Sequence, residues 1–235
     1  MHRPERKVPR LAYPGGWAST TTVPATTLAR IPDGLTPADA CLFGCAGVTT
    51  FNALRHSGAG PGDLVAVLGI GGLGHLAVRF AAAMGFETAA IGRGAEKRAL
   101  AEELGARHYI DAERQHPGAA LTALGGARLI LSTASSTKPL AELTDGLAPP
   151  HGQFTVVGFD GTPLPLPLGK LVMGARTIAG HLTGSPADTE QAMRFAATTG
   201  VRPMVETAPL EEAQHALKTQ QEGKARFRMV LNPDA

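Results

Sequence analysis

The sequence has few cysteines and lacks any long apolar run. Two cysteines among 235 residues are too few for a disulfide framework, so we expect the chain to reside in the reducing cytoplasm. No apolar stretch reaches the roughly 18 residues that a membrane-spanning helix requires. The first ten residues are charged and contain proline, and no apolar segment typical of a secretory signal follows them. We therefore expect neither a membrane partner nor export.

The sequence also lacks a strong excess of charge of either sign. Its 22 basic residues are dispersed along the chain, and 20 acidic residues leave a net charge of +2. Nucleic-acid-binding domains gather positive charge on one face, so we expect no nucleic-acid partner. Hydrophobic residues make up 43% of the chain and charged residues 18%, values that are normal for a globular protein with a sizeable core.

The most informative segment of the chain is Val65–Ala77, which reads VAVLGIGGLGHLA. An apolar, strand-like run leads here into a glycine-rich turn and then into a helix pattern, an arrangement that holds a dinucleotide pyrophosphate. Gly69 permits the tight turn, Gly71 lets the backbone approach phosphate, and Gly74 lets the helix pack on the strand. The first N–H groups of that helix supply anion binding. The cofactor-binding residues predicted in this turn are Gly69, Gly71, Gly72, Leu73 and Gly74.

Strand-like and helix-like segments alternate from Thr49 to about Leu182. The expected strands are Leu64–Leu68, Thr88–Ile91, His108–Ile110, Leu129–Leu131, Phe154–Val157 and Thr177–Gly180. The expected helices are Leu73–Met84, Ala95–Leu104 and Pro139–Leu147. Strands that alternate with helices predict an α/β fold built from parallel β-α-β units with right-handed crossovers.

The two flanks of this region have a different pattern. Residues 1–46 carry a β-like stretch at Trp17–Val23. Residues 183–235 carry two short helix patterns and two extended runs: Ala187–Thr198, Leu210–Gln221, Pro203–Glu206 and Phe227–Leu231. The two flanks therefore do not continue the alternation of strands and helices that spans Thr49 to about Leu182.

Several short segments carry a specific resemblance to a known family. They are Gly15-Gly16-Trp17-Ala18, Ile31-Pro32-Asp33-Gly34-Leu35, Cys45-Ala46-Gly47-Val48-Thr49-Thr50, Gly69–Ala77, Glu96-Lys97-Arg98, Leu104-Gly105-Ala106, Gly184-Ser185, Arg202-Pro203-Met204-Val205-Glu206 and the run Gly223-Lys224-Ala225 with Arg226-Phe227-Arg228. In order and spacing over roughly 220 residues, they resemble the zinc-type alcohol dehydrogenases of the medium-chain dehydrogenase/reductase superfamily.

The resemblance implies a Rossmann fold, a doubly wound parallel six-stranded sheet, flanked by remnants of a GroES-like catalytic domain. Residues 1–46 would be the C-terminal remnant of that domain, residues 47–182 the dinucleotide-binding domain, and residues 183–235 a segment that returns to the catalytic domain. Members of the family begin with a GroES-like domain of well over a hundred residues. We expect this chain to lack most of it.

The resemblance places Cys45 at the third protein ligand of the family's catalytic zinc. Such a zinc ion polarises the alcohol or carbonyl oxygen, and it needs three protein ligands and an open position. The other two ligands, a Cys and a His, would belong to the missing segment, so zinc is expected for the family but held poorly here. Cys41, four residues earlier, is interpreted as a buried apolar thiol.

The choice of cofactor follows from the residues after the second expected strand. An acidic residue there would bind the ribose 2′-OH of NAD, but the sequence has Gly92-Arg93-Gly94 and no carboxylate. Glycine leaves room for a 2′-phosphate, Arg93 can donate to it bidentately, and Lys97 can add charge. These residues favour NADP(H) over NAD(H). The alternative is that Arg93 belongs to an ordinary solvated loop.

The resemblance also implies roles for three further residues. Thr49 would lie beside the nicotinamide ring, the backbone of Val157 would bind the carboxamide, and Arg228 would reach back to the pyrophosphate. The alternative for Arg228 is an exposed basic residue on a strand. His75, in the first turn of the phosphate-binding helix, is interpreted as a helix-surface imidazole.

Two functions from different classes remain open. The first is an NADP-dependent, zinc-type alcohol dehydrogenase that transfers hydride between a small alcohol or aldehyde and nicotinamide, impaired as an isolated chain. The second is a catalytically inactive dinucleotide-binding module. A zinc-free, quinone-reductase-like enzyme is disfavoured because Cys45 occupies a zinc-ligand position. Apolar surface left uncovered by the missing domain would favour a homo-oligomer.

Overall fold

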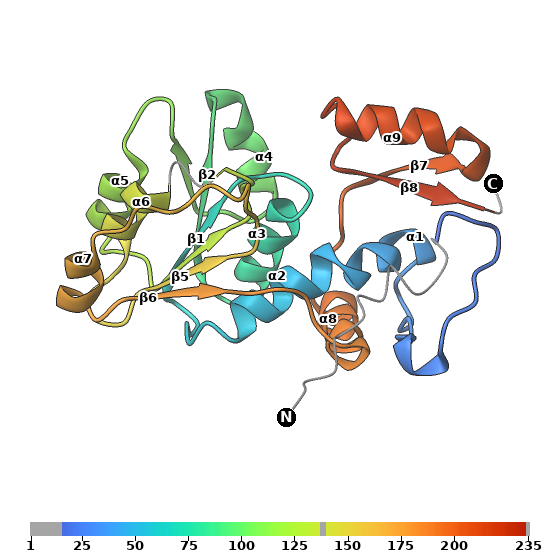
Figure 1. The fold of residues 1–235 in the computed structure, drawn as a ribbon, viewed down its shortest axis with the longest axis horizontal. Helices are drawn as coiled ribbons and strands as arrows, with labels where there is room; N and C mark the ends of the chain where they lie inside the picture. The colour runs from blue at the N-terminus through green and yellow to red at the C-terminus, as the bar shows by residue number, and fades with distance from the viewer. Residues whose placement is uncertain (1–15, 137–139, 234–235) are drawn as a thin grey trace.

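The computed structural model describes residues 16–136 and 140–233, which form two lobes lying side by side (Figure 1). The larger lobe holds a six-stranded parallel sheet in the order β3-β2-β1-β4-β5-β6. Its strands are β1 (Leu64–Leu68), β2 (Glu87–Gly92), β3 (His108–Asp111), β4 (Leu129–Ser132), β5 (Gln153–Val156) and β6 (Thr177–Gly180). This arrangement confirms the predicted Rossmann fold class.

The strands at the centre of the sheet are apolar because helices cover both of its faces. Every residue of β1 and β4 is buried, as expected for parallel strands that lie between two helical layers. Helices α2 (Ala46–Arg55), α3 (Gly74–Ala83) and α4 (Arg98–Glu103) contribute to the apolar core on one face. Helices α5 (Pro117–Ala123) and α6 (Leu140–Leu143) contribute to the core on the other face.

Phe80 of α3 lies at the centre of the core to which α2, α3 and α4 contribute. Its side chain is fully buried, and its ring lies 5.4 Å from that of Phe51, 6.0 Å from that of Phe195 and 6.1 Å from that of Phe43, measured between centroids. Phe195 belongs to α8 (Pro186–Thr199), so aromatic packing joins the C-terminal segment to the larger lobe.

The smaller lobe holds a parallel two-stranded sheet of β7 (Val205–Pro209) and β8 (Arg228–Asn232), connected by α9 (Ala213–Gln221). The short helix α1 (Pro37–Ala40) contacts β7, and a 3₁₀ helix at Cys41–Gly44 leads from α1 into α2. Residues 200–204 connect α8 to β7 and so lead from the larger lobe into the smaller sheet (Figure 1).

The structure differs from the sequence-based expectations in several elements. Trp17–Val23 is irregular rather than a strand, with Trp17 65% exposed and no partner strand beside it among the described residues. The expected helix at 139–147 divides into α6 and a 3₁₀ turn at Thr144–Gly146, and Pro139 lies outside the described residues. Helices α2, α5 and α7 (Leu168–Met173) were not predicted. Within the described part of the chain, no helix is both long and apolar enough to cross a bilayer.

Candidate dinucleotide-binding site

Three of the predicted cofactor-binding residues lie at one edge of the large sheet. Gly69 directly follows β1, Arg93 directly follows β2 and Val157 directly follows β5. Because the strands are parallel and in register, their carboxyl ends meet at the same edge. The strand order reverses between β1 and β4, and sheets of this kind bind ligands where the order reverses.

The glycine-rich turn between β1 and α3 has the backbone geometry that the sequence predicted. Gly69 has a φ of +92°, a conformation that L side chains rarely adopt, and its N–H donates to the carbonyl oxygen of Ile91 at 2.9 Å. A Cβ atom added to Gly74 would overlap the carbonyl oxygen of Gly69. A Cβ atom added to Gly71 would meet no protein atom within 4 Å. The fold itself therefore requires glycine at 69 and 74, whereas space is left open beside Gly71.

Thr133, just after β4, stabilises this turn from the neighbouring strand. Its hydroxyl donates to the carbonyl oxygen of Leu68 at 2.9 Å and lies 3.0 Å from where a Cβ atom on Gly69 would be. No sequence motif singled out this residue. The signal that could have found it is its position directly after a strand that neighbours β1 in a sheet whose order reverses there.

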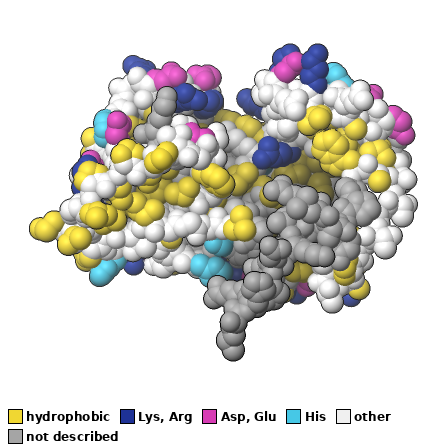
Figure 2. All heavy atoms as spheres, viewed as in Figure 1, with side chains coloured by type: hydrophobic (Ala, Val, Ile, Leu, Met, Phe, Trp, Pro, Cys, Tyr) yellow, Lys and Arg dark blue, Asp and Glu magenta, His cyan; other side chains and the backbone are white. Residues whose placement is uncertain are grey.

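Arg228 brings a positive charge to the turn from the smaller lobe. Its guanidinium group lies against the backbone of Gly72, where a Cβ atom would overlap it. Arg228 is half-buried at the start of β8, whereas Arg226, two residues earlier, is exposed. Figure 2 shows the surface indented between the two lobes, with Lys and Arg side chains (dark blue) on both sides. A guanidinium group from the smaller lobe therefore lies directly beside the glycine-rich turn at the start of α3.

His75 is fully buried, so its interpretation as a helix-surface imidazole is wrong. Its Nδ1 lies 2.9 Å from the carbonyl oxygen of Gly71, and its Nε2 accepts the backbone N–H of Met204 at 3.1 Å. Burial lowers the pKa of His75 to about 4, and the nearby cations Arg79 and Arg228 act in the same direction. The sequence of α3 gives no sign of this burial, because His75 lies one helical turn from Arg79 and the two share a polar side of the helix.

The loop after β2 is fixed by two side chains of β3. The hydroxyl of Tyr109 donates to the carbonyl oxygen of Gly94 at 2.6 Å. Asp111, which is only 5% exposed, accepts the N–H of Gly94 at 3.0 Å and that of Glu113 at 3.0 Å. Burial, followed by the charge of Asp111, raises the pKa of the Tyr109 hydroxyl. Neither residue could be identified from the sequence, because their contacts depend on the register between β2 and β3.

The two basic residues predicted for cofactor choice lie on and just after this loop. Arg93 is exposed directly after β2, and Lys97 is half-buried at the end of a 3₁₀ helix at Ala95–Lys97. A Cβ atom on Gly92 would come within 2.8 Å of the Tyr109 hydroxyl oxygen. Tyr109 therefore requires the glycine at 92, and the loop presents the Arg93 side chain to solvent.

Cys45 is exposed between the 3₁₀ helix at Cys41–Gly44 and α2, and Thr49 is buried in the first turn of α2. Cys41 is exposed as well, so its interpretation as a buried thiol is wrong. Its Sγ donates to the carbonyl oxygen of Ala38 at 3.2 Å, and partial burial of the sulfur together with the charge of Asp39 raises its pKa.

The donor set of the described residues does not fit a catalytic zinc. Such an ion needs three protein ligands, and residues 16–136 and 140–233 contain no group of three or more His, Cys, Asp or Glu side chains that could hold a metal. Cys45 is therefore without two co-ligands in this part of the chain.

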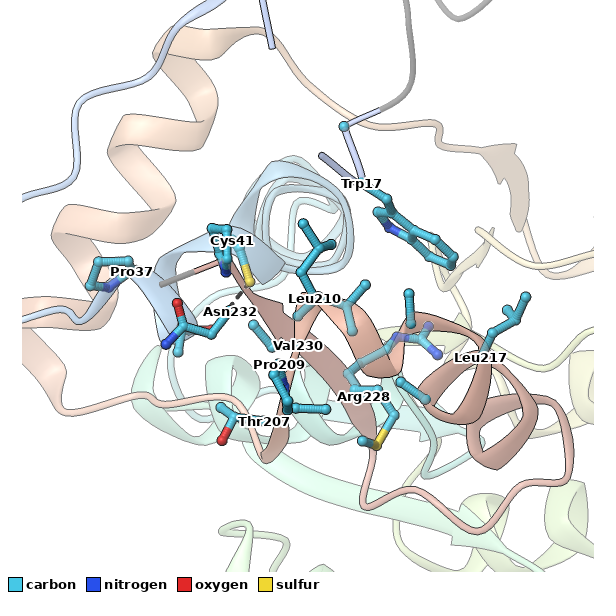
Figure 3. A pocket seen from close by; sticks show the side chains of 18 of the residues that line it. Trp17, Pro37, Cys41, Thr207, Pro209, Leu210, Leu217, Arg228, Val230 and Asn232 are labelled. Atoms are coloured by element: carbon cyan, nitrogen blue, oxygen red, sulfur yellow. Dashed lines mark hydrogen bonds between the residues drawn. The ribbon is translucent and has the colours of Figure 1, made fainter. Parts of the chain in front are cut away.

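A groove of about 770 Å³ runs between α1 and the sheet of the smaller lobe (Figure 3). In Figure 3, Cys41 and Asn232 lie at one end of the groove, and Trp17, Leu217 and Arg228 lie at the other. Arg228 is thus shared between the groove and the glycine turn.

Comparison with known proteins finds a family model and several relatives that match this chain. Residues 72–198 match the family model described as zinc-binding dehydrogenase. Alcohol dehydrogenase notN from Aspergillus sp. (strain MF297-2) is 40% identical over 220 residues, which cover 94% of this chain and 64% of that protein. An alcohol dehydrogenase from Geobacillus stearothermophilus is 38% identical, with 92% of this chain and 64% of that protein covered. The chain spans slightly less than two thirds of the length of these relatives.

Solved structures resemble the fold as a whole. A cinnamyl alcohol dehydrogenase from Sorghum bicolor has a TM-score of 0.74 and 32% identity, over 86% of this chain and 57% of that one. Acetophenone reductase from Geotrichum candidum, solved in complex with NAD, has a TM-score of 0.82 and 22% identity, over 98% and 66% of the two chains. The second likeness shows the fold alone.

Proposed function

The chain belongs to the zinc-binding dehydrogenase family, and we propose that it binds a nicotinamide dinucleotide at the glycine turn as part of an alcohol dehydrogenase. The observation that carries this proposal is the convergence of an open backbone at Gly71 and the guanidinium group of Arg228 over Gly72. Together they offer N–H donors and positive charge to a pyrophosphate at the carboxyl edge of a Rossmann sheet.

We propose that the cofactor is NADP(H) rather than NAD(H). Arg93 is exposed on a loop fixed by Tyr109 and Asp111, and the Oδ1 atom of Asp111 already accepts two backbone N–H groups. The loop after β2 thus offers the guanidinium group of Arg93 to the adenosine ribose, while the carboxylate of Glu96 lies against the backbone of Gly94. A guanidinium group pairs bidentately with a phosphate, which supports recognition of the 2′-phosphate by Arg93 with added charge from Lys97.

The remaining residues have proposed roles around the nicotinamide. The bound nicotinamide supplies the chemistry by accepting or donating hydride. Thr49 lies in the first turn of α2 and orients the ring, and the backbone of Val157, beyond the carboxyl end of β5, contacts the carboxamide. The proposed substrates are small alcohols or aldehydes. Relatives of this chain carry the name alcohol dehydrogenase, which supports that substrate class.

A second candidate function is a dinucleotide-binding module without turnover. The described residues hold no set of three metal ligands, and this observation favours the module for the chain on its own. No catalytic step is therefore assigned to a metal. We also propose a cytoplasmic location, where the two thiols stay reduced, and a homo-oligomer associated through exposed apolar side chains such as Leu168, Val172 and Met173 of α7.

Parallel binding and turnover measurements on the full chain test both candidates. NADPH and NADH are titrated by fluorescence, and oxidation of short alcohols and reduction of aldehydes are then followed with and without added Zn²⁺. Binding together with turnover supports the dehydrogenase, and binding with negligible turnover supports the module. Absence of NADPH and NADH binding contradicts both.

A further inference from the structure

His75 connects the glycine turn to the smaller lobe through two hydrogen bonds. The backbone N–H of Met204 can only donate, so Nε2 of His75, 3.1 Å away, must accept and carry no proton. Nδ1 then carries the proton and donates it to the carbonyl oxygen of Gly71 at 2.9 Å. The imidazole is therefore neutral and held in a single tautomer.

The same contacts continue from Met204 to the strand that carries Arg228. The carbonyl oxygen of Met204 accepts the N–H of Phe227 at 3.0 Å. The ring of Phe227 stacks on the imidazole of His75, with 5.0 Å between centroids and 28° between planes. Arg228 is the next residue, and its guanidinium group lies against Gly72. A continuous series of contacts therefore runs from Gly71 through His75, Met204 and Phe227 to Arg228, which contacts the same turn at Gly72.

We propose that His75 is a positioning residue for dinucleotide binding, which holds Arg228 over the glycine turn by fixing Met204 and Phe227 to Gly71. This inference rests on the proposed function, since it assigns His75 a part in that same site. Met204 is the last residue before β7, and its carbonyl oxygen accepts a hydrogen bond from the residue before β8, so a contact at Met204 sets where β8 begins. The two hydrogen bonds of His75, to Gly71 and to Met204, form what we call the His75 bridge. Without this bridge, the guanidinium group is held less firmly over the turn, and a pyrophosphate loses a pre-oriented partner.

A double-mutant cycle on the full chain tests this proposal. The variants are His75→Leu, Arg228→Ala, the double variant and His75→Gln, whose longer amide can still accept the Met204 N–H. We expect His75→Leu to weaken NADPH binding about tenfold, and we expect no further loss in the Arg228→Ala background. His75→Gln should recover affinity to within about threefold of the wild type. Losses that multiply in the double variant would overturn the proposal.

Two controls separate positioning from general damage to the fold. His108→Leu removes an imidazole that bonds to Glu87 at the opposite edge of the sheet, and we expect it to leave NADPH affinity unchanged. ¹⁵N spectra of the wild type should show an unprotonated Nε2 at His75. An Nε2-protonated tautomer at neutral pH would also overturn the proposal.

A failure of the proposed function can be recognised separately. If the wild-type chain binds neither NADPH nor NADH, the bridge is still measured by hydrogen exchange at the Met204 amide. Protection in the wild type that is lost in His75→Leu supports the bridge. Equal protection in both proteins refutes it.

Discussion

Gly74 packs directly on Gly69, since the carbonyl oxygen of Gly69 occupies the space where a side chain on Gly74 would begin. Gly71, only three residues before Gly74, has no protein atom within 4 Å of the position that a Cβ atom would take. The two positions therefore need glycine for different reasons. One is required by the contact between strand and helix, and the other leaves room for something outside the protein.

Substitution of these two glycines should separate stability from binding. We expect Gly74→Ala to cost about 3 kcal/mol of unfolding free energy, because backbone atoms cannot move aside as a side chain can. Gly71→Ala should change that free energy by less than about 0.5 kcal/mol yet weaken NADPH binding about tenfold. Urea denaturation and fluorescence titration measure both effects. A Gly71→Ala protein with wild-type affinity would argue against a pyrophosphate at this turn.

His75 should make the stability of the protein depend on pH. Its pKa falls from the ordinary 6.5 to about 4 in the folded state, where burial and the cations Arg79 and Arg228 oppose its charge. Between these values the unfolded chain takes up a proton and the folded one does not, so stability falls as the pH drops from 6.5 to 4. Below pH ~4 the free energy of unfolding is lower by about 3 kcal/mol because of His75. This effect is absent well above the ordinary pKa of histidine.

The contribution of His75 is isolated by comparison with a variant that does not titrate. Urea denaturation between about pH 4 and pH 7 gives the free energy of unfolding of the wild type and of His75→Gln. We expect this free energy to depend less steeply on pH in the variant, by a difference that corresponds to up to about one proton taken up on unfolding. Carboxylates titrate in both proteins and cancel in the difference. Parallel pH profiles would show that folding does not lower the pKa of His75.

Arg93→Ala should act on one cofactor and not on the other. Loss of a guanidinium–phosphate pair should weaken NADPH binding about tenfold or more, whereas NADH, which lacks the 2′-phosphate, should bind within about twofold of the wild type. Titrations with both cofactors measure this. Arg114→Ala, an exposed arginine beyond β3, serves as the matched control. An equal loss for NADPH and NADH would assign Arg93 to the pyrophosphate or to the fold.

The contact between α2 and α8 should depend on Arg55. Its guanidinium group lies 3.0 Å from Asp188 and 2.9 Å from the amide oxygen of Asn52, with only 30% of the side chain exposed. We expect Arg55→Ala to lower the melting temperature and to cost about 1 kcal/mol. Lys218→Ala breaks a more exposed pair with Glu222 and should cost close to nothing. Equal effects in the two variants would contradict this ranking.

The zinc content of the purified chain should lie well below one equivalent. The described residues do not supply the two further ligands that a zinc ion at Cys45 would need. A single exposed thiolate binds zinc weakly. Elemental analysis after dialysis against buffer measures the content, and Cys45→Ser should leave it unchanged. One tightly held equivalent that Cys45→Ser removes would show that ligands outside the described residues complete the site.

The parallel sheet could be predicted from the sequence because its signal is local. The central strands β1 and β4 are short, mainly apolar runs, and Leu64–Leu68 is buried along its whole length as its composition indicates. Short helices were harder to predict. Helix α5 has seven residues and α7 has six, so each is too short to repeat an apolar pattern over more than two turns.

The residues that support the site could not be predicted in the same way. Tyr109 and Asp111 reach Gly94 only because β3 pairs with β2 in one register. His75 finds Met204 at a separation of 129 residues, which no spacing rule within a helix reveals. Sequence motifs predict which residues bind a ligand, whereas the residues that hold these positions in place follow from the assembled fold.

Dinucleotide binding at the glycine turn, with selection of the 2′-phosphate by the loop after β2, is the property on which the proposed function depends. Titration of the wild-type chain with NADPH and with NADH, at one ionic strength, tests it most directly. We predict saturable binding of both cofactors, with a dissociation constant for NADPH at least about tenfold lower than that for NADH. Equal constants, tighter binding of NADH, or no binding of either cofactor would contradict it.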